Sequence, residues 1–359
     1  MTLPTHMRAF VLTGHGEMNK LVYREDYPVP QINADEVLIK VAACGLNNTD
    51  VNTRTGWYSK AVDGATTGDA LGNEDEDACW GGTPLTFPRV QGADVVGHVV
   101  AVGANGDPNV MGKRVMIDGW LRDWDAPEVK DGVGFYGSEC DGGFADYAKA
   151  DYRNVHTVES DLSDAELATF ACSWMTAEGM LNRANVGAED TVLITGASGG
   201  VGSALISLAA RRGAKTIAIT SRGKRDKVAA LNPTDIILRE DNLTEALAGR
   251  KVSVVADLVA GDVFPELINA LSRGGRYVAS GAIAGPITQL DIRTLYLHDL
   301  TLLGSTVVPA GTFDDLVSYI EKGEIKPALA ASYPLKELKA AQQAFIDKKH
   351  VGNIVVTMR

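Results

Sequence analysis

The sequence lacks the patterns that mark disulfide-rich, metal-ribbon, secreted and membrane proteins. No two of its four cysteines form a C-x-x-C pair, so the spacing indicates neither a disulfide framework nor a zinc ribbon: Cys44, Cys79, Cys140 and Cys172. The amino terminus, MTLPTHMRAF, has neither the basic start nor the apolar core of a signal peptide, and no apolar run elsewhere is long enough to cross a bilayer. We therefore expect a cytoplasmic protein.

An excess of basic residues is also missing, because 34 Lys and Arg are outnumbered by 46 Asp and Glu and the net charge is −12. Nucleic acids and anionic membranes repel such a chain, so we expect a small-molecule substrate. No internal repeat is visible, which argues against a solenoid. What remains is globular composition, 45% hydrophobic and 22% charged, in a chain of 359 residues that is long enough for two domains.

The most informative segment is residues 191–213, TVLITGASGGVGSALISLAARRG. Its first five residues predict a buried parallel strand, and an amphipathic helix follows the glycines. Between them, Ala197, Gly199 and Gly202 match the dinucleotide fingerprint as A-x-G-x-x-G. Glycines at these positions let a pyrophosphate approach the N–H groups at the start of the helix. An ordinary tight turn gives a similar pattern, but the order of strand, turn and helix favours cofactor binding.

Strand-like runs at 36–43, 94–102 and 113–118 predict a β-rich amino-terminal portion. Further runs alternate with helical or loop segments and predict a six-stranded parallel sheet: 191–195, 217–220, 235–238, 252–259, 276–280 and 301–308. Residues 313–322 and 335–348 look helical, and 353–357 look like a last strand. The long loop 58–88 carries four acids at 74–77, which we interpret as a solvated face, with a cation site as the alternative.

Four segments together resemble the medium-chain dehydrogenase/reductase superfamily: CGLNNTD at 44–50, QGADVVGHVVAVG at 91–103, GASGGVG at 196–202 and VGNIVV at 351–356. They occur in the family's order and span nearly the whole chain. The resemblance implies an α/β protein with a GroES-like β-rich catalytic domain, residues 1–174 and 308–359, and a doubly wound Rossmann domain, residues 175–307. It also implies a homodimer that pairs at the edge of the sixth strand.

The zinc alcohol dehydrogenases of this family carry a cysteine in the first of these motifs, a His-Glu pair in the second and a later cysteine. At the matching positions this sequence has Asn47, Ala93, Asp94 and Cys172. Alanine cannot bind a metal and asparagine is a poor zinc ligand, so we predict that the protein holds no metal. The family's four-cysteine structural zinc lobe is also missing. The alternative is a zinc-type alcohol or carbonyl dehydrogenase that binds the ion through Asp94, Cys172 and the acidic loop.

The sequence is more similar to the zinc-independent quinone oxidoreductases and enone reductases, whose first motif contains Asn-x-x-Asp, as at Asn47 and Asp50. Without a Lewis acid, an activated C=C bond is easier to reduce than a simple ketone, because a hydrogen-bond donor holds the conjugated carbonyl while hydride adds to the β carbon. We predict Asn47, Thr49 and Tyr58 as catalytic residues and Asp50 as structural. A purely structural role for each of the three, and a non-catalytic NADPH-binding protein, are the alternatives.

The predicted cofactor is NADPH. An NAD-selective site keeps an acid after the second strand for the ribose 2′-OH, but residues 220–224 read TSRGK. Ser221 and Arg222 suit a 2′-phosphate instead, unless Arg222 and Lys224 are merely solvated. The resemblance implies further cofactor contacts, of which the last differs from the family's usual lysine or arginine: Thr176, Ser198, Gly199, Gly200, Val201, Val259, Gly281, Ala282, Ser305, Thr306 and Asn353.

Overall fold

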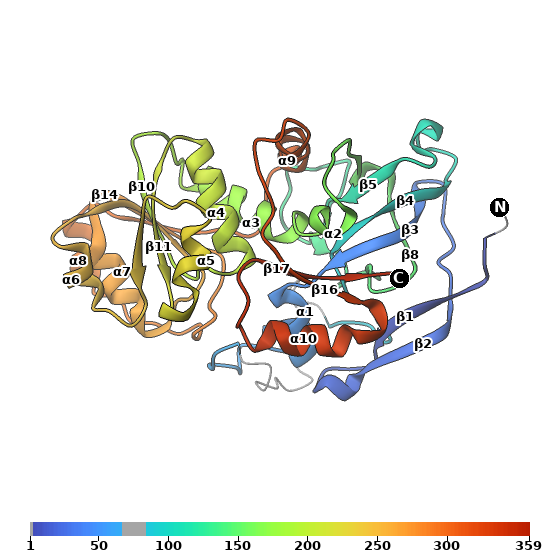
Figure 1. The fold of residues 1–359 in the computed structure, drawn as a ribbon, viewed down its shortest axis with the longest axis horizontal. Coiled ribbons are helices and arrows are strands. Elements are labelled where there is room, and N and C mark those ends of the chain that lie inside the picture. The colour runs from blue at the N-terminus through green and yellow to red at the C-terminus, as the bar shows by residue number, and fades with distance from the viewer. Residues whose placement is uncertain (1–2, 67–83) are drawn as a thin grey trace.

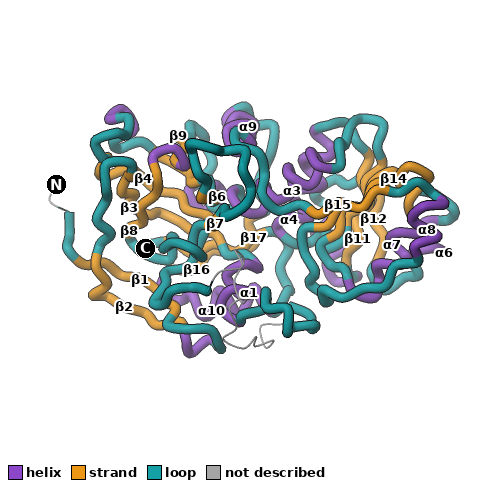
Figure 2. Tube along the Cα trace, turned by 180° about the vertical axis from the view of Figure 1, so that it is seen from behind, coloured by secondary structure: helices purple, strands orange, loops and turns teal. Residues whose placement is uncertain are grey.

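The computed structural model describes residues 3–66 and 84–359, which form two adjoining α/β halves (Figure 1). The acids at 74–77 and Cys79 lie outside the described residues. Each half is built on its own sheet, and Figure 2 shows both sheets from behind. Within the described ranges, no helix has the length and apolar character that a bilayer crossing needs.

One half contains the six-stranded sheet expected from the sequence, with all strands parallel in the order β12-β11-β10-β13-β14-β15. The strand bounds are β10 Thr191–Ile194, β11 Lys215–Thr220, β12 Asp235–Leu238, β13 Val252–Asp257, β14 Leu271–Ala279 and β15 Thr301–Gly304. The strand order changes direction between β10 and β13, and ligands of doubly wound folds bind at such a point. β15 ends four residues before the predicted strand does, so Ser305 and Thr306 follow the strand.

Helices cover both faces of this sheet (Figure 1). Val192 and Ile194 pack on one face with helices α3 and α4, whereas Leu193 packs on the other with α6 and α7. This alternation of buried residues is the reason that the strand reads as continuously apolar. The helix bounds are α3 Ala171–Arg183, α4 Gly200–Arg211, α5 Arg225–Ala229, α6 Leu243–Leu247, α7 Phe264–Ala270 and α8 Ile292–Leu297. The domain boundary predicted after residue 174 falls inside α3.

The other half is the β-rich portion, whose main sheet runs β16-β17-β3-β4-β5-β9, with β8 paired to β3. All of its pairs are antiparallel except β16 with β17. Its strands are β3 Glu36–Gly45, β4 Asp94–Val102, β5 Arg114–Ile117, β8 Tyr147–Asp151, β9 Val155–Thr157, β16 Leu329–Pro334 and β17 Asn353–Thr357. The three predicted amino-terminal strands correspond to β3, β4 and β5, and the predicted last strand to β17.

Smaller elements surround this sheet. Two further pairs are β1 His6–Leu12 with β2 Leu21–Pro28, and β6 Trp120–Leu121 with β7 Gly134–Phe135. The helices are α1 Asn48–Thr55, α2 Asp164–Leu167, α9 Thr312–Glu321 and α10 Leu338–Ile346. The two predicted carboxyl-terminal helices correspond to α9 and α10, although residues 335–337 form a separate 3-10 turn.

The two halves meet where the carboxyl-terminal segment reaches the glycine turn, residues 195–199. The Gly352 N–H, just before β17, donates to the Ser198 carbonyl over 2.9 Å. A second contact joins the segment that follows α1 to the loop after β14, because the Thr66 N–H donates to the Ile283 carbonyl over 3.0 Å. Both contacts lie where the β-rich half approaches the carboxyl edge of the six-stranded sheet.

Candidate functional site

The glycine turn between β10 and α4 has the geometry of an anion cradle. Gly196 has a φ of +58°, a conformation that glycine adopts at little cost. A Cβ on Gly202 would lie 2.3 Å from the Gly196 carbonyl oxygen, so the helix can pack this closely only with glycine there. At Gly199, which caps α4, the nearest atom to such a Cβ is 3.5 Å away. The face of the turn at Gly199 is therefore open to a phosphate.

One lysine contacts this turn, and a second lies close enough to the first for their charges to interact. The Lys224 ammonium, shortly after β11, donates to the Ser198 hydroxyl over 3.2 Å. The Lys348 ammonium, which follows α10, donates to the Asn48 side-chain oxygen over 2.7 Å. Neither forms an ion pair with any carboxylate in the parts of the chain that the structure describes. We call Lys224 and Lys348 the lysine pair.

Burial and neighbouring positive charges lower the pKa of each lysine of the pair. Burial, reinforced by the charge of Lys224, lowers the pKa of Lys348 to about 8. Burial also lowers the pKa of Lys224, and the charges of Arg239 and Lys227 add to the effect. An anion placed between the two ammonium groups would relieve this repulsion.

Arg222 lies in a different environment. Its side chain is 71% exposed, and its guanidinium lies 3.8 Å from the Asp241 carboxylate. Its main-chain N–H donates to the Glu240 carboxylate over 3.1 Å. Ser221 lies immediately after β11, as the sequence predicts. Glu240 was missed by the sequence analysis because it follows the neighbouring strand β12 and not β11 itself.

The other predicted cofactor residues gather along the carboxyl edge of the sheet. Val259 follows β13, Gly281 and Ala282 follow β14, and Ser305 and Thr306 follow β15. The Ser280 hydroxyl donates to the Ser305 carbonyl over 2.7 Å, which ties the ends of β14 and β15 together. Val201 lies in the first turn of α4, and Thr176 lies in α3, where its hydroxyl donates to the Cys172 carbonyl over 2.7 Å.

Asn47 forms part of a buried hydrogen-bond network. Its side-chain Nδ2 donates to the Asp94 carboxylate over 2.9 Å, and its Oδ1 accepts from the Ser173 hydroxyl over 3.3 Å. The Asn353 amide in turn donates to Ser173 over 2.9 Å. Asn47 is only 6% exposed, so both ends of its side chain are used inside the protein. We call Asn47, Asp94, Ser173 and Asn353 the asparagine network.

Asp94 anchors the asparagine network at the start of β4. It is fully buried, and besides Asn47 it accepts a hydrogen bond from the Cys172 N–H over 2.7 Å, so each of its oxygens has a partner. Burial raises the pKa of Asp94 to about 7, although these hydrogen bonds oppose the rise. Burial also raises the pKa of nearby Asp50 to about 7. Asp50 accepts the Asn47 main-chain N–H over 2.8 Å, in agreement with a structural role.

These residues do not fit a catalytic zinc ion. Ala93 offers no ligand, and both oxygens of Asp94 are engaged in hydrogen bonds. Burial, together with the charges of Asp94 and Asp50, raises the pKa of the Cys172 thiol well above its usual value and disfavours the thiolate that zinc binds. Among the residues that the structure describes, no group of three or more His, Cys, Asp or Glu side chains is placed to hold a metal ion.

Thr49 lies in the first turn of α1, and Tyr58 follows the helix. Burial raises the pKa of Tyr58 to about 12, while hydrogen bonding to the Thr49 and Asn52 side chains lowers it. Apart from this approach to Tyr58, the buried Thr49 hydroxyl and Asn52 side-chain oxygen have no hydrogen-bond partner among the described residues. Asn52 was missed by the sequence analysis, although it lies three residues after Thr49 and therefore on the same face of the helix. Unpartnered polar groups of this kind are ready to bind a polar substrate atom.

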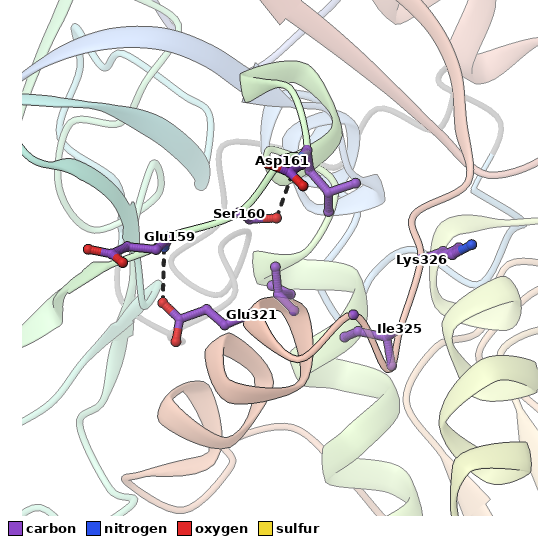
Figure 3. Close-up of a pocket in the computed structure, with 9 residues that line it drawn as sticks. Glu159, Ser160, Asp161, Glu321, Ile325 and Lys326 are labelled. Atoms are coloured by element: carbon purple, nitrogen blue, oxygen red, sulfur yellow. Dashed lines mark hydrogen bonds between the residues drawn. The ribbon is translucent and has the colours of Figure 1, made fainter.

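A cavity of about 440 Å³ lies elsewhere, between residues 159–162 and α9 (Figure 3). The Glu321 side chain extends from α9 toward Glu159, and its carboxylate accepts the Glu159 main-chain N–H over 3.0 Å (Figure 3). None of the candidate catalytic or cofactor residues lines this cavity, so it does not belong to the site described above.

Comparison with known proteins agrees with this arrangement. Residues 33–160 match the alcohol dehydrogenase GroES-like domain, and residues 226–356 match a zinc-binding dehydrogenase family. The chain is 26% identical to acryloyl-coenzyme A reductase of Sulfurisphaera tokodaii, over 98% of this chain and 99% of that protein. It is 26% identical to quinone oxidoreductase of Homo sapiens, over 95% of this chain and 94% of that protein.

A solved structure from Sinorhizobium meliloti 1021, of a protein named as an alcohol dehydrogenase, superposes on this one with a TM-score of 0.90. The two sequences are 44% identical, and the match covers 99% of this chain and 97% of the other. Likeness therefore extends to both halves of the molecule and to relatives named for different reactions.

Proposed function

Because the chain belongs to the medium-chain dehydrogenase/reductase superfamily, we propose that it is an NADPH-dependent reductase that acts on an activated C=C bond or a quinone without catalytic zinc. Its relatives support an oxidoreductase in general and include both an acryloyl-coenzyme A reductase and quinone oxidoreductases. The observation that carries the finer proposal is the asparagine network. A metal ion and this network would need the same space and the same Asp94 oxygens.

Without zinc, the chain's own hydroxyl groups must stabilise the charge that develops on the substrate. NADPH, when bound along the carboxyl edge of the sheet, supplies the hydride. The Tyr58 and Thr49 hydroxyls donate to the carbonyl oxygen of the substrate and so stabilise the enolate that hydride addition to the β carbon creates. The high pKa of Tyr58 keeps its proton in place as a donor at neutral pH. A proton from solvent then reaches the α carbon and completes the reduction.

The lysine pair supports NADPH over NADH. Both ammonium groups lack a carboxylate partner within the described ranges, and a 2′-phosphate would supply the missing negative charge. Lys224 is well placed for this contact because it follows β11, the strand whose end usually selects the cofactor. Glu240 argues in the other direction, since its carboxylate would repel the phosphate, and the Asp241 carboxylate lies 3.8 Å from Arg222 at the same edge.

The test is a screen of cofactor oxidation against enones, quinones, enoyl thioesters and aldehydes, together with elemental analysis of the purified protein. Turnover of an enone, enoyl thioester or quinone by zinc-free protein with NADPH supports the proposal. One tightly held zinc ion per chain, with alcohol or aldehyde turnover that a chelator abolishes, would overturn it in favour of a zinc-type dehydrogenase. Tight NADPH binding without turnover of any substrate would instead indicate a non-catalytic binding protein.

We also propose that the protein is a homodimer that pairs through β15. This strand is at the edge of the sheet, and its Leu302 side chain is exposed. Ile292, Tyr296 and Leu297 on the adjoining α8 are each more than half exposed. An unpaired strand edge beside exposed apolar side chains is a surface that a second copy of the chain can cover.

A further inference from the structure

Asp257 lies at the carboxyl end of β13 and does not belong to the catalytic or cofactor residues predicted above. Its side chain is fully buried, yet it has no cationic partner among the described residues. Hydrogen-bond donors surround it instead. The Thr195 hydroxyl donates to Oδ1 over 2.5 Å, and the Tyr277 hydroxyl donates to Oδ2 over 2.6 Å.

The remaining donors belong to the turn that follows β13. The Val259 N–H donates to Oδ1 of Asp257 over 2.9 Å, and the Ala260 N–H lies 3.2 Å from both oxygens. The Leu258 N–H completes the set by donating to the Thr195 hydroxyl over 2.9 Å. Three successive main-chain N–H groups, at residues 258–260, are thus held by one carboxylate and the threonine bonded to it.

This turn is strained. Ala260 has φ +53° and ψ −144°, a region that is essentially restricted to glycine. A residue with a Cβ stays there only when its surroundings fix the backbone, and at Ala260 the fixing contacts are those to Asp257. Loss of the carboxylate would therefore let the turn relax to an ordinary conformation.

The turn is packed against the glycine turn. Thr195, which bonds Asp257, immediately precedes Gly196, and a Cβ on Gly196 would lie 3.5 Å from the Val259 side chain. On the other side of the turn, the Val259 carbonyl accepts a hydrogen bond from the Ala284 N–H over 2.8 Å. Ile283 beside it carries the carbonyl that receives the Thr66 N–H from the β-rich half. Asp257 thus fixes a turn that touches the glycine turn directly and is linked through residues 283–284 to the opposite half of the molecule.

We propose that Asp257 is a positioning residue for the nicotinamide cofactor, which acts by holding residues 258–260 in their strained shape beside the glycine turn. The inference rests on the proposed function only in assuming that a nicotinamide cofactor binds at this edge. It does not depend on NADPH being preferred, on the substrate or on the absence of zinc.

The test measures cofactor affinity by the fluorescence of the bound reduced nicotinamide, with whichever cofactor the wild-type protein binds more tightly. Asp257→Asn keeps the size of the side chain but points an NH₂ group at donors, so the turn relaxes and the Kd rises about tenfold or more. Tyr277→Phe is the matched control, because it removes one bond from the same carboxylate and leaves the turn's own bonds intact. Its Kd changes less than about threefold.

Ala260→Gly separates positioning from simple stability. Glycine adopts this backbone conformation without strain. The double variant Asp257→Asn with Ala260→Gly should therefore reverse at least half of the rise in log Kd that Asp257→Asn causes alone. Should Asp257→Asn fail to fold, Thr195→Val is measured in its place, since it removes the hydroxyl that links Asp257 to Leu258. A folded Asp257→Asn or Thr195→Val variant with wild-type affinity would overturn the inference, as would a double variant that recovers nothing.

A wild-type protein that prefers NADH, or that turns over an alcohol with zinc, would contradict the proposed function and leave this comparison of Kd values intact. The two proposals therefore fail by different measurements.

Discussion

Asn47 illustrates how a single residue acquires its role from distant parts of the chain. The sequence predicts it as a catalytic donor, but in the structure one N–H group of its amide is bonded to Asp94 and its oxygen accepts from Ser173. These partners lie 47 and 126 residues along the chain, so local pattern gives no sign of them. Thr49 and Tyr58 differ, because the side chains that interact with the Tyr58 hydroxyl, Thr49 and Asn52, lie close to it in the sequence.

We therefore expect Tyr58→Phe to lower kcat for an enone by about 10- to 100-fold while KM for NADPH stays within about threefold. Thr49→Val should lower kcat in the same direction. The measurement is steady-state kinetics at saturating NADPH. Trp57→Phe, which changes the ring packed edge-on against Tyr58 at 5.8 Å, is the control and should retain most of kcat. Equal losses in all three variants would assign the effect to packing.

The buried carboxyl group of Asp94 should make stability depend on pH. Its pKa is about 7 in the folded protein against about 4 in an unfolded chain, so folding favours the protonated form. The penalty for burying its charge is absent below about pH 4, grows between about pH 4 and pH 7, and stays constant above that range. The free energy of unfolding should therefore fall over this range by up to about 4 kcal/mol.

Asp94→Asn tests this assignment. An Asn47 amide turned over can accept from the new NH₂ group and donate to Ser173, so the variant should fold. Its Tm should decline less than that of the wild type between pH 4 and pH 7, with a similar contribution from Asp50 left in both proteins. Parallel Tm profiles for the two proteins would show that Asp94 is not the responsible group.

At the scale of elements, the sheets could be predicted from the sequence because their apolar runs are local. The six parallel strands and the strands β3, β4, β5 and β17 follow from such runs. Helix α1 could not be predicted in this way, since its residues are mostly polar and yet six of the eight are buried. Its burial depends on contacts with segments far away in the sequence, such as the bond between Arg54 and Gln342.

The lysine pair is another element-scale feature that the sequence alone did not reveal. Lys224 belongs to the predicted cofactor loop, but Lys348 comes from the segment between α10 and β17 and approaches Asn48, 300 residues earlier. Only the folded chain brings it close enough to Lys224 for their charges to interact. Arg222, which the sequence analysis favoured, extends into solvent instead.

We expect Lys224→Ala to raise the Kd for NADPH about tenfold and the Kd for NADH less than about threefold, because only NADPH carries the 2′-phosphate. Isothermal titration with both cofactors measures this ratio. Lys227→Ala on α5 is the control for a general loss of positive charge and should change neither value strongly. An equal rise for NADPH and NADH on Lys224→Ala would assign the lysine to the pyrophosphate shared by both.

Affinity for NADPH should also fall as the pH rises above about 8. In the cofactor-free protein, Lys348 loses its proton near that pH. The phosphate binds the charged form of Lys348, so binding at higher pH requires the uptake of a proton. In Lys348→Met, the Kd for NADPH should be higher than that of the wild type at pH 7 and nearly constant between pH 7 and pH 9. A wild-type Kd that is flat across this range would contradict the role of Lys348.

At the scale of the whole molecule, main-chain hydrogen bonds within the described ranges join the two halves at Gly352 to Ser198 and at Thr66 to Ile283. Such contacts join residues far apart in the sequence, and so the fold of each half could be predicted while the geometry between them could not. The same holds for the exposed apolar side chains on α8 and on the edge strand β15, since their exposure follows only from the folded chain.

We expect Leu302→Lys combined with Tyr296→Glu to convert the protein from a dimer to a monomer, because each substitution places charge in the apolar contact. Sedimentation velocity at several protein concentrations measures the assembly state. Val129→Lys, which changes an exposed apolar residue in the other half, is the control and should leave assembly unchanged. A wild-type protein that stays monomeric at all concentrations would refute the pairing.

The contact between Gly352 and the glycine turn has a consequence for how the protein is made. The turn at 195–199 leaves the ribosome long before residues 348–353, which supply Lys348, Gly352 and Asn353 to the same region. A nascent chain can form the six-stranded sheet only after β15 has emerged, and residues 348–353 reach the start of α4 later still. On the proposed function, a cofactor bound at this edge meets its full set of contacts only after this segment has been made.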